Sequence, residues 1–185
     1  MSRTAVWGVG SLLLIAQGCA SLPGLGWTRG DLPAFAQVDE GLYRGGQPSP
    51  EGIRRLAQMG VKTIVNLRHH SKAMDQERRL AQELGMRWVN LPMYVWWRPS
   101  DAQVRQFLSI VTDPVNRPVF AHCRQGWNRV GIMVAIYRVV ANHWTPYEAY
   151  LEGRRHGLAA WNLATRHLLF RETPSEFLLG RDPPS

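Results

Sequence analysis

The sequence predicts a single α/β domain in which helices flank a central, largely parallel sheet. The chain has 185 residues, which is enough for one ordinary domain and too few for two sizeable ones. Hydrophobic residues make up 45% and charged residues 19%, a composition typical of globular proteins. From residue 35 onward, short apolar runs alternate with amphipathic segments, which is the pattern of repeated β–α units.

The expected strands are short apolar runs bounded by turn residues. Residues 35–43 predict one or two strands that end in the turn at 45–48. The run at 61–67 is rich in β-branched residues and is expected to be a buried strand. Further strands are predicted over 86–91 and 118–121.

The expected helices begin at capping residues and end at glycine or proline. Ser49 followed by Pro50 predicts the start of a helix that runs to Met59 and stops at Gly60. The other helices are predicted over 74–84, over 101–112 after the cap Ser100, over 130–141, from Thr145-Pro146 onward, and over 158–170. In such a fold the functional site lies where the parallel strands end, which singles out the strand before Cys123.

The first 19 residues have the layout of an export signal. Arg3 is followed by an uncharged apolar run at 5–16, which is short for a membrane span. The closing pair Gly18-Cys19 resembles a bacterial lipobox, so we expect acylation of Cys19 and a lipid anchor in the membrane. An ordinary signal peptide cut after Ala20, or an uncleaved anchor or misread start, are the alternatives.

The rest of the chain divides into a tether, a domain and a tail. We expect a flexible tether over 20–34, a domain over 35–172 and a loose tail over 173–185. In enteric bacteria, an aspartate directly after the lipidated cysteine retains a lipoprotein at the inner membrane. Here Ala20 and Ser21 follow Cys19 instead. A periplasm-facing location on the outer membrane is therefore favoured.

The charge pattern indicates anion recognition at defined positions. Basic residues number 22 against 14 acidic ones, for a net charge of +8, and only Lys62 and Lys72 are lysines. Arginine suits bidentate recognition of phosphate or carboxylate. Without any run of five or six like charges, nucleic acid is not an expected partner.

The segment His122–Arg129 carries the chemistry and reads H-C-x5-R between a strand and a helix. A strand-to-helix turn directs backbone N–H groups at one point, and the helix adds its positive N-terminal end. Both would stabilise the thiolate of Cys123 and make it a nucleophile. Gly126 lets the loop close around an anion, and Arg129 can return a planar fork to two phosphate oxygens.

This segment resembles the signature loop of the cysteine-dependent protein tyrosine and dual-specificity phosphatases. The resemblance covers about residues 35–155 and extends to 43–49, 65–68 and 118–129, which follow one another as in small bacterial dual-specificity-like members. It implies hydrolysis of phosphate monoesters through a phosphocysteine intermediate, with no cofactor and no metal. The expected partner is a phosphorylated substrate: a phosphoprotein, an inositol phosphate or phosphoinositide, or a phospholipid headgroup.

The resemblance also implies a role for each loop residue. Cys123 would attack phosphorus, Arg129 would hold the phosphate, and His122 would support Cys123. The backbone amides that would cradle the phosphate belong to Arg124, Gln125, Gly126, Trp127 and Asn128. Upstream, Arg44 is expected to pair with loop carbonyls.

The general acid is less well indicated by the sequence. The family places an aspartate on a loop before the cysteine, and Asp101 is the expected acid here, although an acid in a first helical turn is also favoured by the helix dipole. Asp113 stands before Pro114, where a turn role is the simpler account. Trp96, Trp97 and Trp127 would lie around the mouth of the site, as substrate contacts or as ordinary packing.

Two departures from the family pattern leave other functions open. Val130 replaces the Ser or Thr that usually follows the arginine, and Asn128 replaces an aspartate common in bacterial relatives. A catalytically impaired phosphate-binding protein is therefore the alternative to a phosphatase. A cysteine redox or sulfur-transfer protein is a weaker alternative, because sulfur transfer does not require Arg129.

Overall fold

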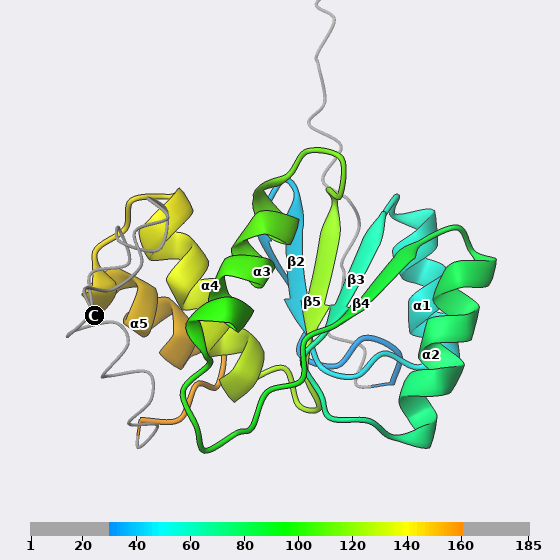
Figure 1. The fold of residues 1–185 in the computed structure, drawn as a ribbon, viewed down its shortest axis with the longest axis horizontal. Coiled ribbons are helices and arrows are strands. Elements are labelled where there is room, and N and C mark those ends of the chain that lie inside the picture. The colour runs from blue at the N-terminus through cyan, green and yellow to red at the C-terminus, as the bar shows by residue number, and fades with distance from the viewer. Residues whose placement is uncertain (1–29, 161–185) are drawn as a thin grey trace, which may run out of the picture.

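The structure, a computed structural model, describes residues 30–160 and has a five-stranded sheet in the order β1-β2-β5-β3-β4 (Figure 1). The strands are β1 Ala36–Asp39, β2 Leu42–Gly45, β3 Thr63–Asn66, β4 Arg87–Asn90 and β5 Val119–His122. The helices are α1 Pro50–Gln58, α2 Lys72–Glu83, α3 Asp101–Thr112, α4 Asn128–Ala141 and α5 Pro146–Arg155. The β1–β2 pair is antiparallel and the other three pairs are parallel, which confirms the predicted fold class.

Helices cover both faces of the sheet (Figure 1): α1 and α2 pack on one face, and α3 and α4 on the other, with α5 against α4. Successive strand residues point to opposite faces. Ile64 and Phe120 therefore pack with the residues of α1, while Val65 and Ala121 pack with those of α3 and α4. Because both faces are buried, β3 and β5 have no exposed residue.

The helix starts follow from capping side chains. The hydroxyl of Ser49 accepts a hydrogen bond from the backbone N–H of Gly52 at the start of α1. Ser100 and Gln103 form a capping box at the start of α3, whose bounds are those predicted. The α3 helix begins near the sheet edge where the parallel strands end, so its first turn lies on the side of the loop after β5 (Figure 1).

The helix predicted over 158–170 is wrong at its start, because residues 158–160 are not helical. Gly157, with φ +86°, ends α5, and the backbone N–H of Leu158 donates to the carbonyl of Gly153 at 2.9 Å. Leu158 is thereby turned into the core next to Gly131. The rest of that predicted helix lies outside the described residues, as do the export signal with Cys19, most of the tether and the tail. Among the helices of residues 30–160, none has the length and apolar character needed to cross a bilayer.

Candidate active site

Cys123 lies at the carboxyl end of β5, the central strand of the sheet. A five-residue loop, 123–127, connects β5 to α4. Cys123 is a free thiol and is 3% exposed. Its position is the one that sites take in parallel α/β sheets, where the strands end and the next helix begins.

The loop presents a set of unused backbone donors. Within residues 30–160, no backbone carbonyl accepts a hydrogen bond from the N–H groups of residues 124–128. The 14-residue helix α4 has no acidic residue in its first turn, and Trp127 provides no side-chain cap. The N-terminal end of this helix and the loop amides are therefore left to bind an anion.

The loop is held in shape by the carboxyl end of β2. Gly126 has φ +80°, and a Cβ there would approach the carbonyl carbon of Gly45 to 2.7 Å, so both backbone conformation and close approach require glycine. The guanidinium of Arg44 donates from Nη2 to the carbonyls of Gly126, at 3.0 Å, and Trp127, at 3.5 Å. The predicted pairing of Arg44 with loop carbonyls is confirmed. Burial lowers the pKa of Arg44 to about 10.

Arg129 lies in the first turn of α4 and reaches toward the end of β3. Its Nη1 donates to the carbonyl oxygen of Leu67 at 3.4 Å. Arg129 is half-buried. This arrangement allows the Arg129 guanidinium to donate two hydrogen bonds to an anion that is bound by the loop amides.

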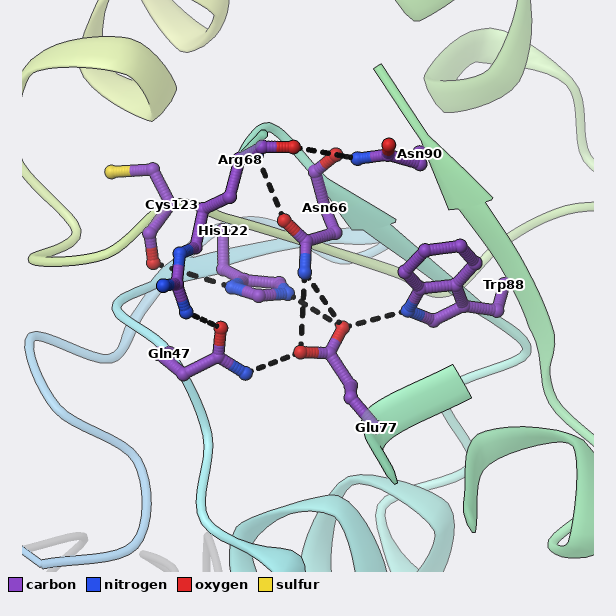
Figure 2. A network of polar contacts seen from close by, with 8 residues as sticks. All are labelled: Gln47, Asn66, Arg68, Glu77, Trp88, Asn90, His122 and Cys123. Carbon is purple, nitrogen blue, oxygen red and sulfur yellow. Dashed lines mark hydrogen bonds and ion pairs between the residues drawn. The ribbon is translucent and has the colours of Figure 1, made fainter. Parts of the chain in front are cut away.

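Behind the loop lies a buried polar network centred on Glu77 (Figure 2). The Glu77 carboxylate, on α2, accepts hydrogen bonds from His122 Nε2 at 2.9 Å, from Trp88 Nε1 at 2.7 Å, and from Asn66 Nδ2 at 3.2 Å. Gln47 Nε2 donates to its other oxygen. Its side chain is 1% exposed, so these donors replace water entirely.

The network fixes His122 directly before the cysteine. Burial would raise the pKa of Glu77, but the charge of His122 and hydrogen bonds from His122, Trp88 and Gln47 outweigh it and lower that pKa to about 2. The other ring nitrogen, His122 Nδ1, lies 3.3 Å from the carbonyl oxygen of Cys123. His122 therefore ties the start of the loop to α2.

Glu77 is not among the site residues predicted from the sequence, although the sequence carries a signal for it. Met74, Glu77 and Ala81 are spaced by three and four residues, and all three are buried on one face of α2. A carboxylate in the apolar stripe of an amphipathic helix indicates a buried partner.

The other predicted residues are placed as follows. The side chain of Asp101, in the first turn of α3, is 44% exposed and makes an ion pair with Arg98 at 3.7 Å. Its role as the acid stays a prediction. Asp113 accepts a hydrogen bond from the backbone N–H of Val115 at 2.9 Å, which confirms its turn role. Trp96, Trp97 and Trp127 are exposed.

The two departures from the family pattern have structural positions of their own. Asn128 Oδ1 accepts from the backbone N–H of Ala159 at 2.9 Å and so joins the start of α4 to the segment after α5. Val130 is fully buried and packs in the core. Neither side chain adds a hydroxyl or carboxylate to the loop.

The fold and this loop define the class of cysteine-dependent phosphatases with a tyrosine or dual-specificity phosphatase domain. Residues 28–166 match the family described as "DSP-PTPase phosphatase fused to NAD+ Kinase". The chain belongs to this family of cysteine-dependent dual-specificity phosphatases, whose characterised members are phosphoric monoester hydrolases.

Three curated relatives show how far the similarity extends. The chain is 32% identical over 117 residues to the dual specificity protein phosphatase TpbA of Pseudomonas aeruginosa, covering 63% of this chain and 51% of TpbA. It is 35% identical over 106 residues to a probable chloroplastic NAD kinase 2 of Oryza sativa, covering 55% of this chain and 11% of the kinase. It is 25% identical over 147 residues to the inositol diphosphatase DSP4 of Arabidopsis thaliana, covering 73% and 69%.

A solved structure supports the fold. The crystal structure of TpbA superposes with a TM-score of 0.68 at 23% identity, covering 80% of this chain and 89% of that one. In the sequence comparisons, by contrast, the chain spans about half the length of the curated TpbA sequence and about a tenth of that of the NAD kinase. Its similarity to the kinase is confined to that small part.

Proposed function

We propose that this protein hydrolyses phosphate monoesters through a phosphocysteine intermediate. The observation that carries the proposal is the loop after β5, in which a buried cysteine begins a set of unused backbone donors at the start of α4. This arrangement binds a phosphate dianion and directs a sulfur nucleophile at its phosphorus.

The reaction follows in two displacements. The Cys123 thiolate forms an S–P bond while the bond to the ester oxygen breaks, and that oxygen leaves with a proton from Asp101. Water then attacks the phosphocysteine and gives a proton back to the Asp101 carboxylate while the S–P bond breaks, which releases inorganic phosphate and regenerates the thiolate. The amides of residues 124–128 and the guanidinium of Arg129 bind the equatorial oxygens in both steps, and this charge stabilisation supplies most of the rate enhancement.

A phosphate-binding protein without turnover is the second candidate, favoured by Asn128 and Val130. Asn128 is engaged with Ala159 and Val130 is buried, so neither assists hydrolysis of the phosphocysteine. Such a protein would keep the loop amides and Arg129, and would bind orthophosphate tightly.

We further propose that the protein is exported and held on the periplasmic side of the outer membrane by acyl chains on Cys19. The apolar run before Gly18-Cys19 supports this proposal. Mass spectrometry of the chain isolated from a Gram-negative host tests it: acylation at Cys19, absent in Cys19→Ser, is expected, and a chain that begins at Met1 without acyl groups would refute it.

Turnover of an aryl phosphate, with a metal chelator present, tests the leading proposal. We expect Cys123→Ser to abolish turnover and Asp101→Asn to reduce it by about 10²- to 10⁴-fold, with loss of the limb of the pH profile that reports the acid. Asp113→Asn, at the other end of α3, is the matched control. Orthophosphate binding without turnover would establish the second candidate, and an unchanged rate in Asp101→Asn would remove Asp101 from the mechanism.

A further inference from the structure

The connection between β4 and α3 exposes three large aromatic side chains. Tyr94 is 63% exposed, Trp96 is 73% exposed and Trp97 is 71% exposed, and Arg98 directly follows them. These residues, 94–98, form the aromatic segment. Large apolar side chains that gather on an exposed surface mark a place where the protein contacts a partner.

The aromatic segment is fixed at both ends by residues that face the core. Met93 is buried, and its backbone N–H donates to the carbonyl of Leu67 at 3.2 Å. Pro99 is buried at the other end, where the capping box of Ser100 and Gln103 begins α3. Packing inside the domain therefore uses Met93 and Pro99 and leaves the rings of the aromatic segment outside.

The aromatic segment lies beside the loop after β5. The carbonyl of Leu67, which holds the start of the segment, also accepts a hydrogen bond from Arg129 Nη1 at 3.4 Å. The ring centre of Tyr94 lies 4.1 Å from that of His69, which follows β3. Trp127, within the loop itself, is exposed as well. Figure 1 shows that the β4–α3 and β5–α4 connections leave the sheet on the same side.

Positive charge accompanies these aromatic side chains. Arg98 and Arg124 are exposed, and Arg68 and Arg129 are half-buried. Burial lowers the pKa of Arg68, and repulsion from Arg129 and Arg124 lowers it further, because these cations gather at one edge of the domain. Asp101, which follows the segment in the chain, is paired with Arg98 at 3.7 Å. This edge is therefore complementary to an anionic surface.

The described part of the chain also begins at this edge. A Cβ on Gly126, in the loop after β5, would lie 2.9 Å from the Cβ of Ala34, so Ala34 lies against that loop. Gly30 follows Cys19 by 11 positions, and a chain of that length spans at most about 40 Å. An acyl anchor on Cys19 would therefore keep this edge within reach of a bilayer.

We propose that the aromatic segment docks on the surface of an anionic lipid bilayer, with the rings of Tyr94, Trp96 and Trp97 at the level of the headgroups. Tryptophan and tyrosine favour this interface, because the apolar ring meets the acyl chains while the N–H or O–H group stays hydrated. The neighbouring arginines add attraction to anionic headgroups. The loop that begins with Cys123 then faces the bilayer. This contact belongs to the domain itself and goes beyond the proposed export and acylation.

Quenching of tryptophan fluorescence by brominated lipid tests the docking. The full chain carries Cys19→Ser, so that no acyl chain contributes. It is mixed with vesicles of phosphatidylglycerol and phosphatidylcholine in equal parts, the phosphatidylcholine with or without bromine on its acyl chains. Trp96→Phe combined with Trp97→Phe keeps apolar rings, so the emission that this variant loses belongs to Trp96 and Trp97. We expect bromine to lower that emission by about twofold or more.

Trp144→Phe is the matched control, because Trp144 lies beyond the other end of α4, where its ring centre is 4.3 Å from the guanidinium carbon of Arg138. The emission of Trp144 should be the same with and without bromine. Replacing phosphatidylglycerol by unbrominated phosphatidylcholine should reduce the quenching of Trp96 and Trp97 by about twofold or more, since the anionic headgroups are then missing.

Three results would overturn the docking: no quenching of Trp96 and Trp97, equal quenching in the two lipid mixtures, or equal quenching of Trp144. The first would point to a protein partner or a substrate group as the occupant of the aromatic segment. None of these measurements requires acylation of Cys19 or hydrolysis of a phosphate ester. Failure of the docking surface and failure of the proposed function are therefore distinguishable.

Discussion

Glu77→Gln tests how much the buried pair of Glu77 with His122 stabilises the folded protein. The native carboxylate has its pKa lowered to about 2 from 4.5, a shift that corresponds to about 3 kcal/mol of folding free energy at neutral pH. Glutamine keeps the shape but loses the charge, and its amide N–H groups would face donors of Trp88, Asn66 or Gln47. We expect a loss of about 3 kcal/mol at pH 7.

The pH dependence gives the sign of the effect. Because the folded-state pKa of Glu77 is depressed, its stabilisation is fully present above pH 4.5 and is lost as the pH falls toward 2. Urea denaturation at pH 7 and pH 4 should therefore show the difference between native chain and Glu77→Gln shrinking by about 1 kcal/mol.

Glu83→Gln, an exposed glutamate of the same helix, is the matched control and should change stability by less than about 0.5 kcal/mol. A Glu77→Gln variant as stable as Glu83→Gln would refute the reasoning. A stability difference between the two chains that stays constant from pH 7 to pH 4 would refute it as well. The contribution of a carboxylate with a depressed pKa must decrease as the pH falls through this range.

Three further substitutions test the loop. Gly126→Ala should lower the free energy of unfolding by about 2 kcal/mol or more and abolish orthophosphate binding. Gly60→Ala is the control, because Gly60 has a similar φ of +78° but no atom within 4 Å of the added Cβ. It should lower the free energy of unfolding by about 1 kcal/mol and leave orthophosphate binding intact. Arg44→Lys should weaken orthophosphate binding about tenfold in calorimetry, since the loop carbonyls lose their donor. Asn128→Ala should lower stability by about 1 kcal/mol in thermal denaturation, because the N–H of Ala159 loses its acceptor.

The parts of the fold predicted well are those determined by local chemistry. Ser49 and Ser100 marked the starts of α1 and α3, and Gly60 marked the end of α1, because caps and left-handed glycines act within one turn of chain. The helix expected over 158–170 fails at its start for the opposite reason. Leu158 is drawn into the core beside Gly131, a tertiary contact that overrides local periodicity.

The site divides in the same way. The H-C-x5-R motif needs only a strand, a tight loop and a helix in succession, so the sequence alone indicates Cys123, Gly126 and Arg129 as one constellation. The general acid, by contrast, comes from a segment well before Cys123 in the chain. The sequence predicts Asp101 for this role but does not establish that its carboxyl group lies near the loop.

By itself, the sequence determined the α/β class, the element order and the loop that begins with Cys123, since each depends on residues close together in the chain. Tertiary structure alone decided which distant side chains support that loop. Gln47, Glu77 and His122 come from three separated segments, and they meet because parallel pairing places the ends of β2, β5 and β3 side by side. The hydrogen-bond partners of the buried Glu77 carboxylate come from distant segments of the chain. The local sequence around Glu77 therefore does not predict which residues they are.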